Sequence, residues 1–259
     1  MNNTPEIETN GKARKIYFAS DCHLGVPDAE SSLIREKHFV KWLDEIKQDA
    51  TEIYLLGDIF DFWFEYKTVV PRGYVRLLGK LAELTDSGII IHYFTGNHDM
   101  WMFDYLTKEL NIDVFRKPIV KEIFGKTFYV AHGDGLGRAD YGYKLIKAIF
   151  ANKICQWLFA RLHPNFGMWL GLYFSKSSRV ANGDTDEVFL GEEKERLIQY
   201  CKKKSEEEHF DYFIFGHRHL PLDIKISETS RYINLGEWVK SFSYAELSET
   251  GLELKFYKK

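Results

Sequence analysis

The sequence predicts an α/β protein in which two β-sheets pack face to face between helices, with one helical insertion. Three features of the chain favour this two-sheet α/β sandwich. In the first half, short apolar runs alternate with longer segments of helical periodicity. From residue 124 onward, strand-like segments separated by turn residues follow one another. Residues that can bind metals close several of the apolar runs.

The first half of the chain predicts alternating strands and helices. Apolar runs at residues 15–20, 53–56 and 89–94 indicate buried strands, because strands of a parallel sheet are covered on both faces. Residues 31–47 and 69–87 space their apolar side chains as amphipathic helices do. This order predicts a largely parallel sheet, whose ligands gather beyond the carboxyl ends of its strands.

The second half predicts six further strands, each a short apolar or alternating run bounded by turn residues. They are expected at residues 127–131, 212–215, 223–227, 231–235, 242–247 and 252–257. Residues 1–14 are polar and predict a loose N-terminal tail. Residues 15–259 are then expected to form one domain.

Composition narrows the class of protein. The net charge of -3 gives no overall bias toward nucleic acid, so no nucleic-acid partner is expected. Cys22, Cys155 and Cys201 show no paired spacing, which argues against a disulfide framework and fits a reducing compartment. No uninterrupted apolar stretch reaches the roughly 18 residues that a spanning helix needs. No signal peptide is visible in residues 1–15.

Five short motifs carry residue types that bind metals. They are Asp21-Cys22-His23, Gly57-Asp58, Gly96-Asn97-His98-Asp99, His132-Gly133-Asp134 and Gly216-His217-Arg218-His219. Most follow predicted strands, so we expect them at one edge of a sheet. Asp21 and His23 are two residues apart and, on an extended segment, would point to the same side. A carboxylate at Asp58 can bridge two ions.

The motifs together predict a site for two divalent metals. A single histidine is more often structural than a ligand, so the prediction depends on the ordered set. Its seven members are Asp21, His23, Asp58, Asn97, His132, His217 and His219. Mixed nitrogen and oxygen ligands suit Mn, Fe, Zn or Co better than Ca. Two-metal sites of this kind hydrolyse phosphate esters and anhydrides. For Asp61 and Trp63, support of this site and simple packing both stay open.

The order of these motifs resembles that of the calcineurin-like metallophosphoesterases, over about residues 15–257. The resemblance implies the metallophosphoesterase fold and two sets of metal ligands. The first set is Asp21, His23, Asp58 and His219, and the second is Asp58, Asn97, His132 and His217. It also implies that His98 is the acid at the leaving group and that Asp99 orients it.

Within that family, three segments resemble the bacterial UDP-2,3-diacylglucosamine diphosphatases. They are residues 53–64, residues 132–136 with the following Asp140 and Tyr143, and residues 235–238. These enzymes hydrolyse a lipid A precursor to lipid X and UMP at the cytoplasmic face of the inner membrane. The resemblance implies two divalent metals with Mn²⁺ preferred, a nucleotide-linked glycolipid substrate, a cytoplasmic and peripheral location, and no obligate protein partner. The best-known branch has arginine where this chain has His98, so a sister branch with altered substrate preference stays open.

The long spacing between His132 and His217 predicts a helical cap at about residues 140–190, broken near Pro164 and Gly167. Residues 141–183 contain no acid, but six Lys or Arg and nine aromatic residues. This composition suits an anionic membrane surface, or a cavity for acyl chains beside a diphosphate. An ordinary helical hairpin is the alternative. The expected substrate-binding residues are Asp140, Tyr143, Lys144, Lys147 and Arg179.

Other functions stay open at this point. A phosphodiesterase or nucleotide-sugar pyrophosphatase would use the same metals on a different substrate, a soluble one included. A scaffold that has lost its chemistry should lack several ligands, and none is missing here. A nuclease predicts a basic stripe along an open groove, whereas the positive charge is concentrated in the insertion.

Overall fold

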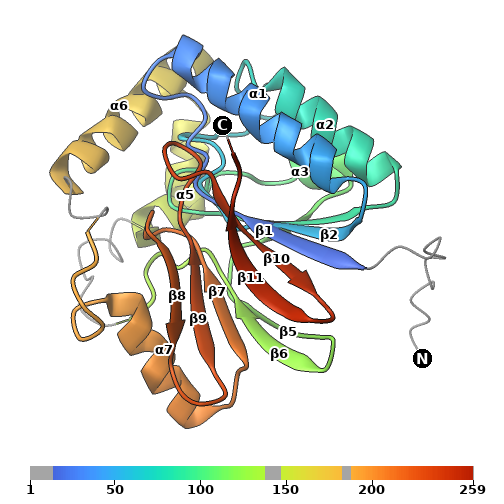
Figure 1. Cartoon of the computed structure of the whole chain (residues 1–259). Helices are drawn as coiled ribbons and strands as arrows, with labels where there is room; N and C mark the ends of the chain where they lie inside the picture. Colours follow the sequence, from blue (N-terminus) through green and yellow to red (C-terminus); the bar gives the residue numbers. More distant parts are fainter. Residues whose placement is uncertain (1–13, 138–146, 183–187, 259) are drawn as a thin grey trace, which may run out of the picture.

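Two β-sheets pack face to face at the centre of the protein, and helices cover both outer faces (Figure 1). The computed structural model describes residues 14–137, 147–182 and 188–258. The predicted two-sheet α/β sandwich is confirmed. The tail expected at residues 1–14 lies outside the described residues, except for residue 14.

The first sheet has six strands in the order β11-β10-β1-β2-β3-β4. Four are parallel: β1 (Lys15–Ala19), β2 (Ala50–Leu55), β3 (Ile90–Phe94) and β4 (Asp113–Phe115). The other two are β10 (Ser243–Ser248), which pairs antiparallel with β1, and β11 (Gly251–Phe256), which pairs antiparallel with β10. Its outer face is covered by α1 (Ala29–Ile46), α2 (Val75–Asp86) and α3 (Tyr105–Leu110) (Figure 1).

The second sheet has five strands in the order β5-β6-β7-β9-β8. Its three inner strands are parallel: β6 (Lys126–Val130), β7 (Tyr212–Phe215) and β9 (Arg231–Leu235). Antiparallel strands form its edges: β5 (Ile119–Ile123) and β8 (Pro221–Lys225). Helix α7 (Arg196–Glu207) covers its outer face. The sequence patterns had not indicated β4 or β5.

Strand β1 illustrates why the strands read as continuous apolar runs. Ile16 and Phe18 pack between the two sheets, whereas Tyr17 and Ala19 pack under the helices. Because both faces of the strand are buried, every position carries an apolar side chain. The polar residues begin only where the strand ends, at Ser20 and Asp21.

Helix α2 begins at Val75, whereas periodicity predicted a helix over residues 69–87. One carboxylate oxygen of Glu36 on α1 accepts hydrogen bonds from the amides of Arg76 and Leu77 at 2.9 and 3.0 Å. These amides are among the first of the helix and have no partner within it. A residue of another helix therefore caps α2, and a local sequence pattern does not contain this contact.

Two helices between β6 and α7 form what we call the helical cap: α5 (Lys153–Phe159) and α6 (Pro164–Asn182). Pro164 begins α6, as the sequence suggested, but Gly167 lies within the helix and does not break it. Met168 and Leu172 of α6 pack against the cluster of Phe62, Phe64 and Trp101. Among the described residues, no helix is both long and apolar enough to cross a membrane.

Candidate metal centre

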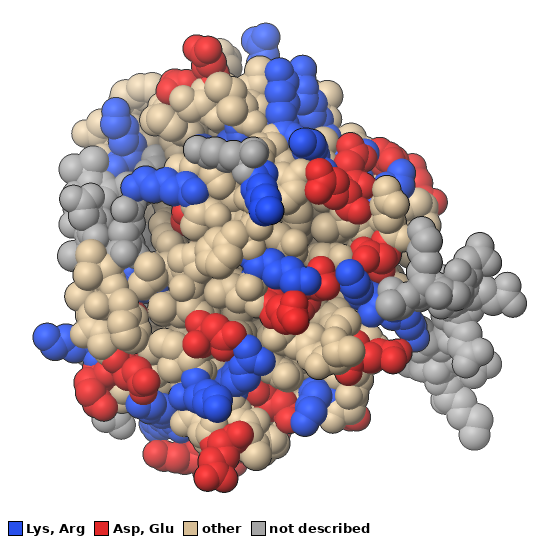
Figure 2. All heavy atoms as spheres, in the orientation of Figure 1, with Lys and Arg blue, Asp and Glu red and all other residues tan. Residues whose placement is uncertain are grey.

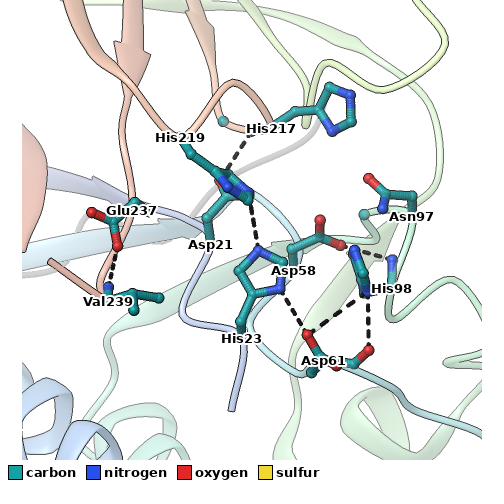
Figure 3. A network of polar contacts seen from close by, with 12 residues as sticks. Asp21, His23, Asp58, Asp61, Asn97, His98, His217, His219, Glu237 and Val239 are labelled. Carbon is teal, nitrogen blue, oxygen red and sulfur yellow. Dashed lines mark hydrogen bonds and ion pairs between the residues drawn. The ribbon is translucent and has the colours of Figure 1, made fainter. Parts of the chain in front are cut away.

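The seven predicted ligands meet where the carboxyl ends of both sheets come together. Figure 3 labels all of them except His132. Asp21, Asp58 and Asn97 follow β1, β2 and β3 of the first sheet, and His23 follows Asp21. His132 follows β6, and His217 with His219 follows β7, both in the second sheet. The sequence-based expectation of one sheet edge was therefore too simple. Both sheets contribute, because their parallel strands end on the same side of the sandwich.

Unusual backbone conformations direct five of these ligands. Asp21, His23, Asp58, His217 and His219 have φ of 55°, 44°, 52°, 66° and 51°. Such left-handed values are uncommon for residues other than glycine and often mark functional sites. Asp21 and His23 consequently do not lie on an extended segment, as their spacing had suggested. The left-handed turn still brings Nε2 of His23 to 3.7 Å from Oδ1 of Asp21.

Two glycines allow the loops after β2 and β3 to approach each other. A Cβ atom on Gly57 would lie 2.6 Å from the amide nitrogen of Gly96. A Cβ atom on Gly96 would lie 2.2 Å from Oδ1 of Asp58. No side chain fits at either position, so these glycines let the Asp58 carboxylate enter the centre.

The first ligand group consists of Asp21, His23 and His219. Oδ1 of Asp21 is fully buried and accepts no well-aligned hydrogen bond among the described residues. Nε2 of His219 lies 3.1 Å from this oxygen and 3.0 Å from Nε2 of His23. Nδ1 of His23 lies 3.2 Å from a carboxylate oxygen of Asp61, which accepts its proton and leaves a lone pair on Nε2. A buried anion and converging imidazole nitrogens fit a divalent cation.

The second group consists of Asp58, Asn97, His132 and His217. Nδ1 of His132 donates a hydrogen bond to the carbonyl of Leu56 at 2.6 Å, which leaves Nε2 free to bind a metal. Nε2 of His132 lies 3.2 Å from Oδ2 of Asp58 and 3.4 Å from Oδ1 of Asn97. Ligand atoms of Asp58, His132 and His217 all lie within 4.8 Å of one another. These donors therefore also fit a divalent metal.

The electrostatics of the centre favour positive charge. Burial alone would raise the pKa of Asp58, but the imidazoles of His132, His98 and His23 hold it well below its usual range. Burial opposes protonation of His132, yet the Asp58 carboxylate raises its pKa to about 10, and a bound metal would take the place of that proton on Nε2. Burial lowers the pKa of His217 to about 4, so this imidazole is neutral near pH 7. A buried carboxylate that stays ionised is suited to a cation.

Asp61 supports the centre by contacting His23 on the ring nitrogen that faces away from the other ligands, and Trp63 makes no such contact. The fully buried Asp61 carboxylate fixes the ring of His23 through the contact with Nδ1. Carboxylates that orient metal-binding histidines in this way are common around metal sites. The indole nitrogen of Trp63 donates instead to Glu65 at 3.1 Å, and its ring packs on Phe60. Trp63 is therefore part of the packing.

Asp99 holds the loops around Asp58 together. Its carboxylate accepts hydrogen bonds from the amides of Ile59 and Gly96 at 3.1 and 2.7 Å, and from the Tyr93 hydroxyl. These bonds join the loops after β2 and β3 around Asp58. That Asp99 orients His98 stays a prediction, and the bond to Gly96 holds the loop that carries His98.

The ring of His98 is held by two other residues. Its Nδ1 lies 3.1 Å from the carbonyl oxygen of Asp61 and 2.9 Å from Oγ of Ser175. Its backbone amide donates to Oδ1 of Asp58 at 2.8 Å. Burial lowers the pKa of His98 to about 4, against the opposite effect of Asp58. His98 thus lies next to Asp58 through its amide and next to the ring of His23, whose centroid is 4.9 Å away. Its support by Ser175 was missed by sequence reasoning.

Only part of the expected substrate-binding set can be placed. Asp140, Tyr143 and Lys144 lie outside the described residues, and for Arg179 the structure describes the helix but not the side chain. Lys147 is described, and its ammonium pairs with the carboxylate of Asp134. Asp134, two residues after the predicted ligand His132, therefore balances one of the six basic charges of the segment at residues 141–183.

Two cavities flank the centre. One of about 560 Å³ is lined by His23 and His219 and by Arg35, Lys176 and Glu237. The other, of about 400 Å³, is lined by His132, Lys147, Arg116 and Lys117 among others. Sequence reasoning had not selected Arg35 or Lys176, although Lys176 belongs to the acid-free segment. On the face shown in Figure 2, the described Lys and Arg side chains mix with acids and form no continuous basic groove.

The chain is similar to several known proteins. The family described as calcineurin-like phosphoesterase matches residues 14–221. A Porphyromonas gingivalis protein called UDP-2,3-diacylglucosamine hydrolase is 40% identical over 253 residues, which cover 93% of this chain and 97% of that protein. An Aeromonas salmonicida protein of the same name is 25% identical over 87% of both chains. A solved archaeal phosphodiesterase aligns with a TM-score of 0.47 and 13% identity, over 94% of this chain and 99% of its own. The chain belongs to the calcineurin-like phosphoesterases, and to the same family as the UDP-2,3-diacylglucosamine hydrolases.

Proposed function

We propose that this protein hydrolyses the diphosphate of UDP-2,3-diacylglucosamine to lipid X and UMP, a step in lipid A biosynthesis. The observation that carries the proposal is the 40% identity to a UDP-2,3-diacylglucosamine hydrolase across 97% of that protein. The convergence of the predicted metal ligands supports it, since a two-metal hydrolase needs such a set.

Two divalent transition metals would be held by the two ligand groups, with Asp58 shared between them. Mn²⁺ is the ion we propose, and Fe, Zn or Co suit the same mixture of carboxylate, amide and imidazole donors. When bound, such a pair of metals lowers the pKa of water to roughly 7 and stabilises negative charge on phosphoryl oxygens. Every donor atom needed for this is buried or half-buried at the meeting point of the two sheets.

His98 would act on the leaving group. Its Nδ1 is engaged by Asp61 and Ser175, so the opposite nitrogen, Nε2, is the one that can meet a substrate. The negative charge of a diphosphate beside the ring favours its protonated form and opposes the effect of burial. A proton on Nε2 can then pass to the departing phosphate oxygen.

The flanking cavities give room for a substrate that extends on both sides of its diphosphate. Lys147 and Lys176 each line one of them. Ammonium groups at these positions suit a phosphorylated substrate. We propose Asp140, Tyr143, Lys144, Lys147 and Arg179 as contributors to substrate binding, with Lys176 added.

The outer face of the cap supports a location at the cytoplasmic face of the inner membrane. Phe166, Trp169 and Tyr173 form a stack along α6 with ring centroids 5.7 Å apart. All three are about half exposed, at 49%, 58% and 55%. Exposed aromatic rings beside basic residues suit the interface of an anionic membrane. Such contact would bring the centre to a lipid substrate without a spanning helix.

One assay tests the proposal and its alternative. With Mn²⁺ present, UMP release from UDP-2,3-diacylglucosamine is compared with turnover of UDP-GlcNAc and of bis-p-nitrophenyl phosphate. We expect kcat/KM to be highest for the diacylated substrate by at least about 100-fold, or about 2.7 kcal/mol in barrier. Equal or faster turnover of UDP-GlcNAc would favour the alternative, a metallophosphoesterase that acts on a different, soluble substrate.

A further inference from the structure

One residue of the cap reaches the reaction centre. Ser175 lies on α6 and is only 8% exposed. Its hydroxyl donates to Oδ2 of Asp61 at 2.5 Å, and the same oxygen lies 2.9 Å from Nδ1 of His98. The cap is thus tied by hydrogen bonds both to the carboxylate that orients His23 and to the imidazole beside Asp58. Figure 3 shows His23, Asp58, Asp61 and His98 in this arrangement.

These contacts determine which nitrogen of His98 carries a proton. Nδ1 faces the carbonyl oxygen of Asp61 at 3.1 Å, and a carbonyl oxygen only accepts hydrogen bonds. The single hydroxyl proton of Ser175 goes to the Asp61 carboxylate, so Oγ also accepts from Nδ1. Nδ1 is therefore the protonated nitrogen. In Figure 3 the other ring nitrogen lies on the side of the Asp58 carboxylate.

The short serine side chain reaches His98 because α6 lies very close to the core. Gly167, Gly171 and Ser175 are four residues apart, so they share one face of the helix. A Cβ atom on Gly171 would lie 2.3 Å from the ring of Phe62, and one on Gly167 would lie 2.2 Å from the Tyr66 hydroxyl. Larger residues at the two glycines would push the helix, and Ser175 with it, away from the centre.

We propose that Ser175 is a positioning residue of the reaction, through which the seated cap holds His98 with Nε2 toward the substrate. The proposal rests on the proposed function, in which His98 assists the leaving group. It assigns the cap a part in the chemical step, in addition to any part in binding lipid. Locking one tautomer and one ring orientation is a recurrent way to prepare an imidazole for proton transfer.

The first test compares Ser175→Ala with Ser177→Ala. Ser177 lies on the same helix and is exposed, and its hydroxyl bonds only to the carbonyl of Tyr173 among the described residues. We expect Ser175→Ala to lower kcat on UDP-2,3-diacylglucosamine about tenfold and to change KM less than about twofold. The loss is smaller than the roughly 10²–10⁴-fold that general acid catalysis supplies, because His98 itself is still present. Turnover of bis-p-nitrophenyl phosphate should fall only about twofold, because p-nitrophenolate leaves without a proton. Ser177→Ala should match the wild type, and Ser175→Thr should recover most of kcat.

The second test asks whether Ser175 acts through His98. In a His98→Ala background, adding Ser175→Ala should change kcat by less than about twofold, since coupled residues are not additive. Metal content measured by elemental analysis should stay at the wild-type level in Ser175→Ala. Selective ¹⁵N labelling of histidine gives a readout without turnover: His98 should carry its proton on Nδ1 in the wild type and become a mixture of tautomers in Ser175→Ala.

Several results would overturn the proposal. Kinetically, these are equal kcat in Ser175→Ala and Ser177→Ala, a change in KM alone in Ser175→Ala, or an undiminished effect of Ser175→Ala in the His98→Ala background. The other two are loss of metal in Ser175→Ala and a wild-type His98 that carries its proton on Nε2. Failure of the proposed function is recognised separately, because the wild-type protein itself would then not release UMP from UDP-2,3-diacylglucosamine.

Discussion

The metal centre and the helical cap are neighbours with opposite surface properties. In the centre, Asp21, Asp58 and His132 are at most 3% exposed, and their side chains are held by neighbouring groups. On the cap, Trp157 and Trp169 expose 56% and 58% of their surface to solvent. The centre is thus built to fix atoms at given places, whereas the outer face of the cap leaves large apolar groups without cover. The difference indicates that chemistry belongs to the first region and contact with something apolar to the second.

Helix α6 belongs to both regions, because its two faces differ. Gly171 and Ser175 lie against the core, and Trp169 and Tyr173 lie on the opposite face. Substitutions on the inner face should therefore affect catalysis and stability, and substitutions on the outer face should affect association with lipid. The following predictions test this division, from the largest expected effect to the smallest.

Removal of metals should have the largest effect. We expect EDTA treatment to lower kcat at least about 10³-fold, or about 4 kcal/mol in barrier, on lipid and soluble substrates alike. Mn²⁺ should restore activity, and Ca²⁺ should not, because imidazole ligands suit transition metals better. Measurement is by UMP and p-nitrophenol release after dialysis. Elemental analysis would check that the treated protein is free of transition metals. If such protein kept full activity, the metal centre would have no part in the reaction.

Asp58→Asn should come next. Loss of its charge should weaken metal binding and lower kcat by between about 10-fold and 10³-fold on every substrate. This corresponds to a barrier higher by about 1.4 to 4 kcal/mol. Binding to anionic vesicles should be unchanged, since the cap is untouched. Asp86→Asn is the control, because Asp86 is an exposed carboxylate at the end of α2. If Asp58→Asn kept metal content and kcat within a factor of ten, the two-metal interpretation would be wrong.

Gly171→Ala should show how the cap and the centre are joined. The added methyl group would overlap the ring of Phe62, so we expect a loss of about 1–3 kcal/mol in the free energy of unfolding. A fall in kcat should accompany it, because Ser175 would move with the helix. Gly79→Ala is the matched control in α2, where nothing lies within 4 Å of the new Cβ atom.

The control has an expected direction of its own. Alanine is favoured over glycine inside a helix, so Gly79→Ala should raise the free energy of unfolding by about 0.5–1 kcal/mol. Urea unfolding of both variants measures the difference. If Gly171→Ala were also stabilising and fully active, close seating of α6 would have no bearing on catalysis.

The smallest effect on chemistry is expected for Trp169→Ser combined with Tyr173→Ser. Vesicles with anionic lipid should bind this variant at least about tenfold more weakly, because two exposed aromatic rings are lost. Turnover of bis-p-nitrophenyl phosphate should stay within about twofold of the wild type. Phe256→Ser removes an equally exposed ring on β11 and serves as the control. Unchanged vesicle binding by the double variant would show that the aromatic stack has no role in membrane binding.

The sequence by itself determined the candidate metal ligands and the general architecture. Metal binding restricts the choice of residue to a few types, so Asp21, Asp58 and His132 stand out in any context. Strands that are buried on both faces need apolar residues at every position, so they appear in the sequence as continuous apolar runs. The ligands come directly after those runs. Both signals depend on neighbouring positions in the chain and can be read without the fold.

The tertiary structure decided how the residues are held and directed. The left-handed backbone at His23, the Asp61 carboxylate behind it and the Ser175 hydroxyl on His98 had no distinct sequence signal. Ser175 follows Asp61 by 114 residues, and the start of α2 likewise depends on Glu36 of another helix. Such contacts form only when distant segments pack together, so their physical basis lies in packing and hydrogen bonding between segments, which no local pattern records.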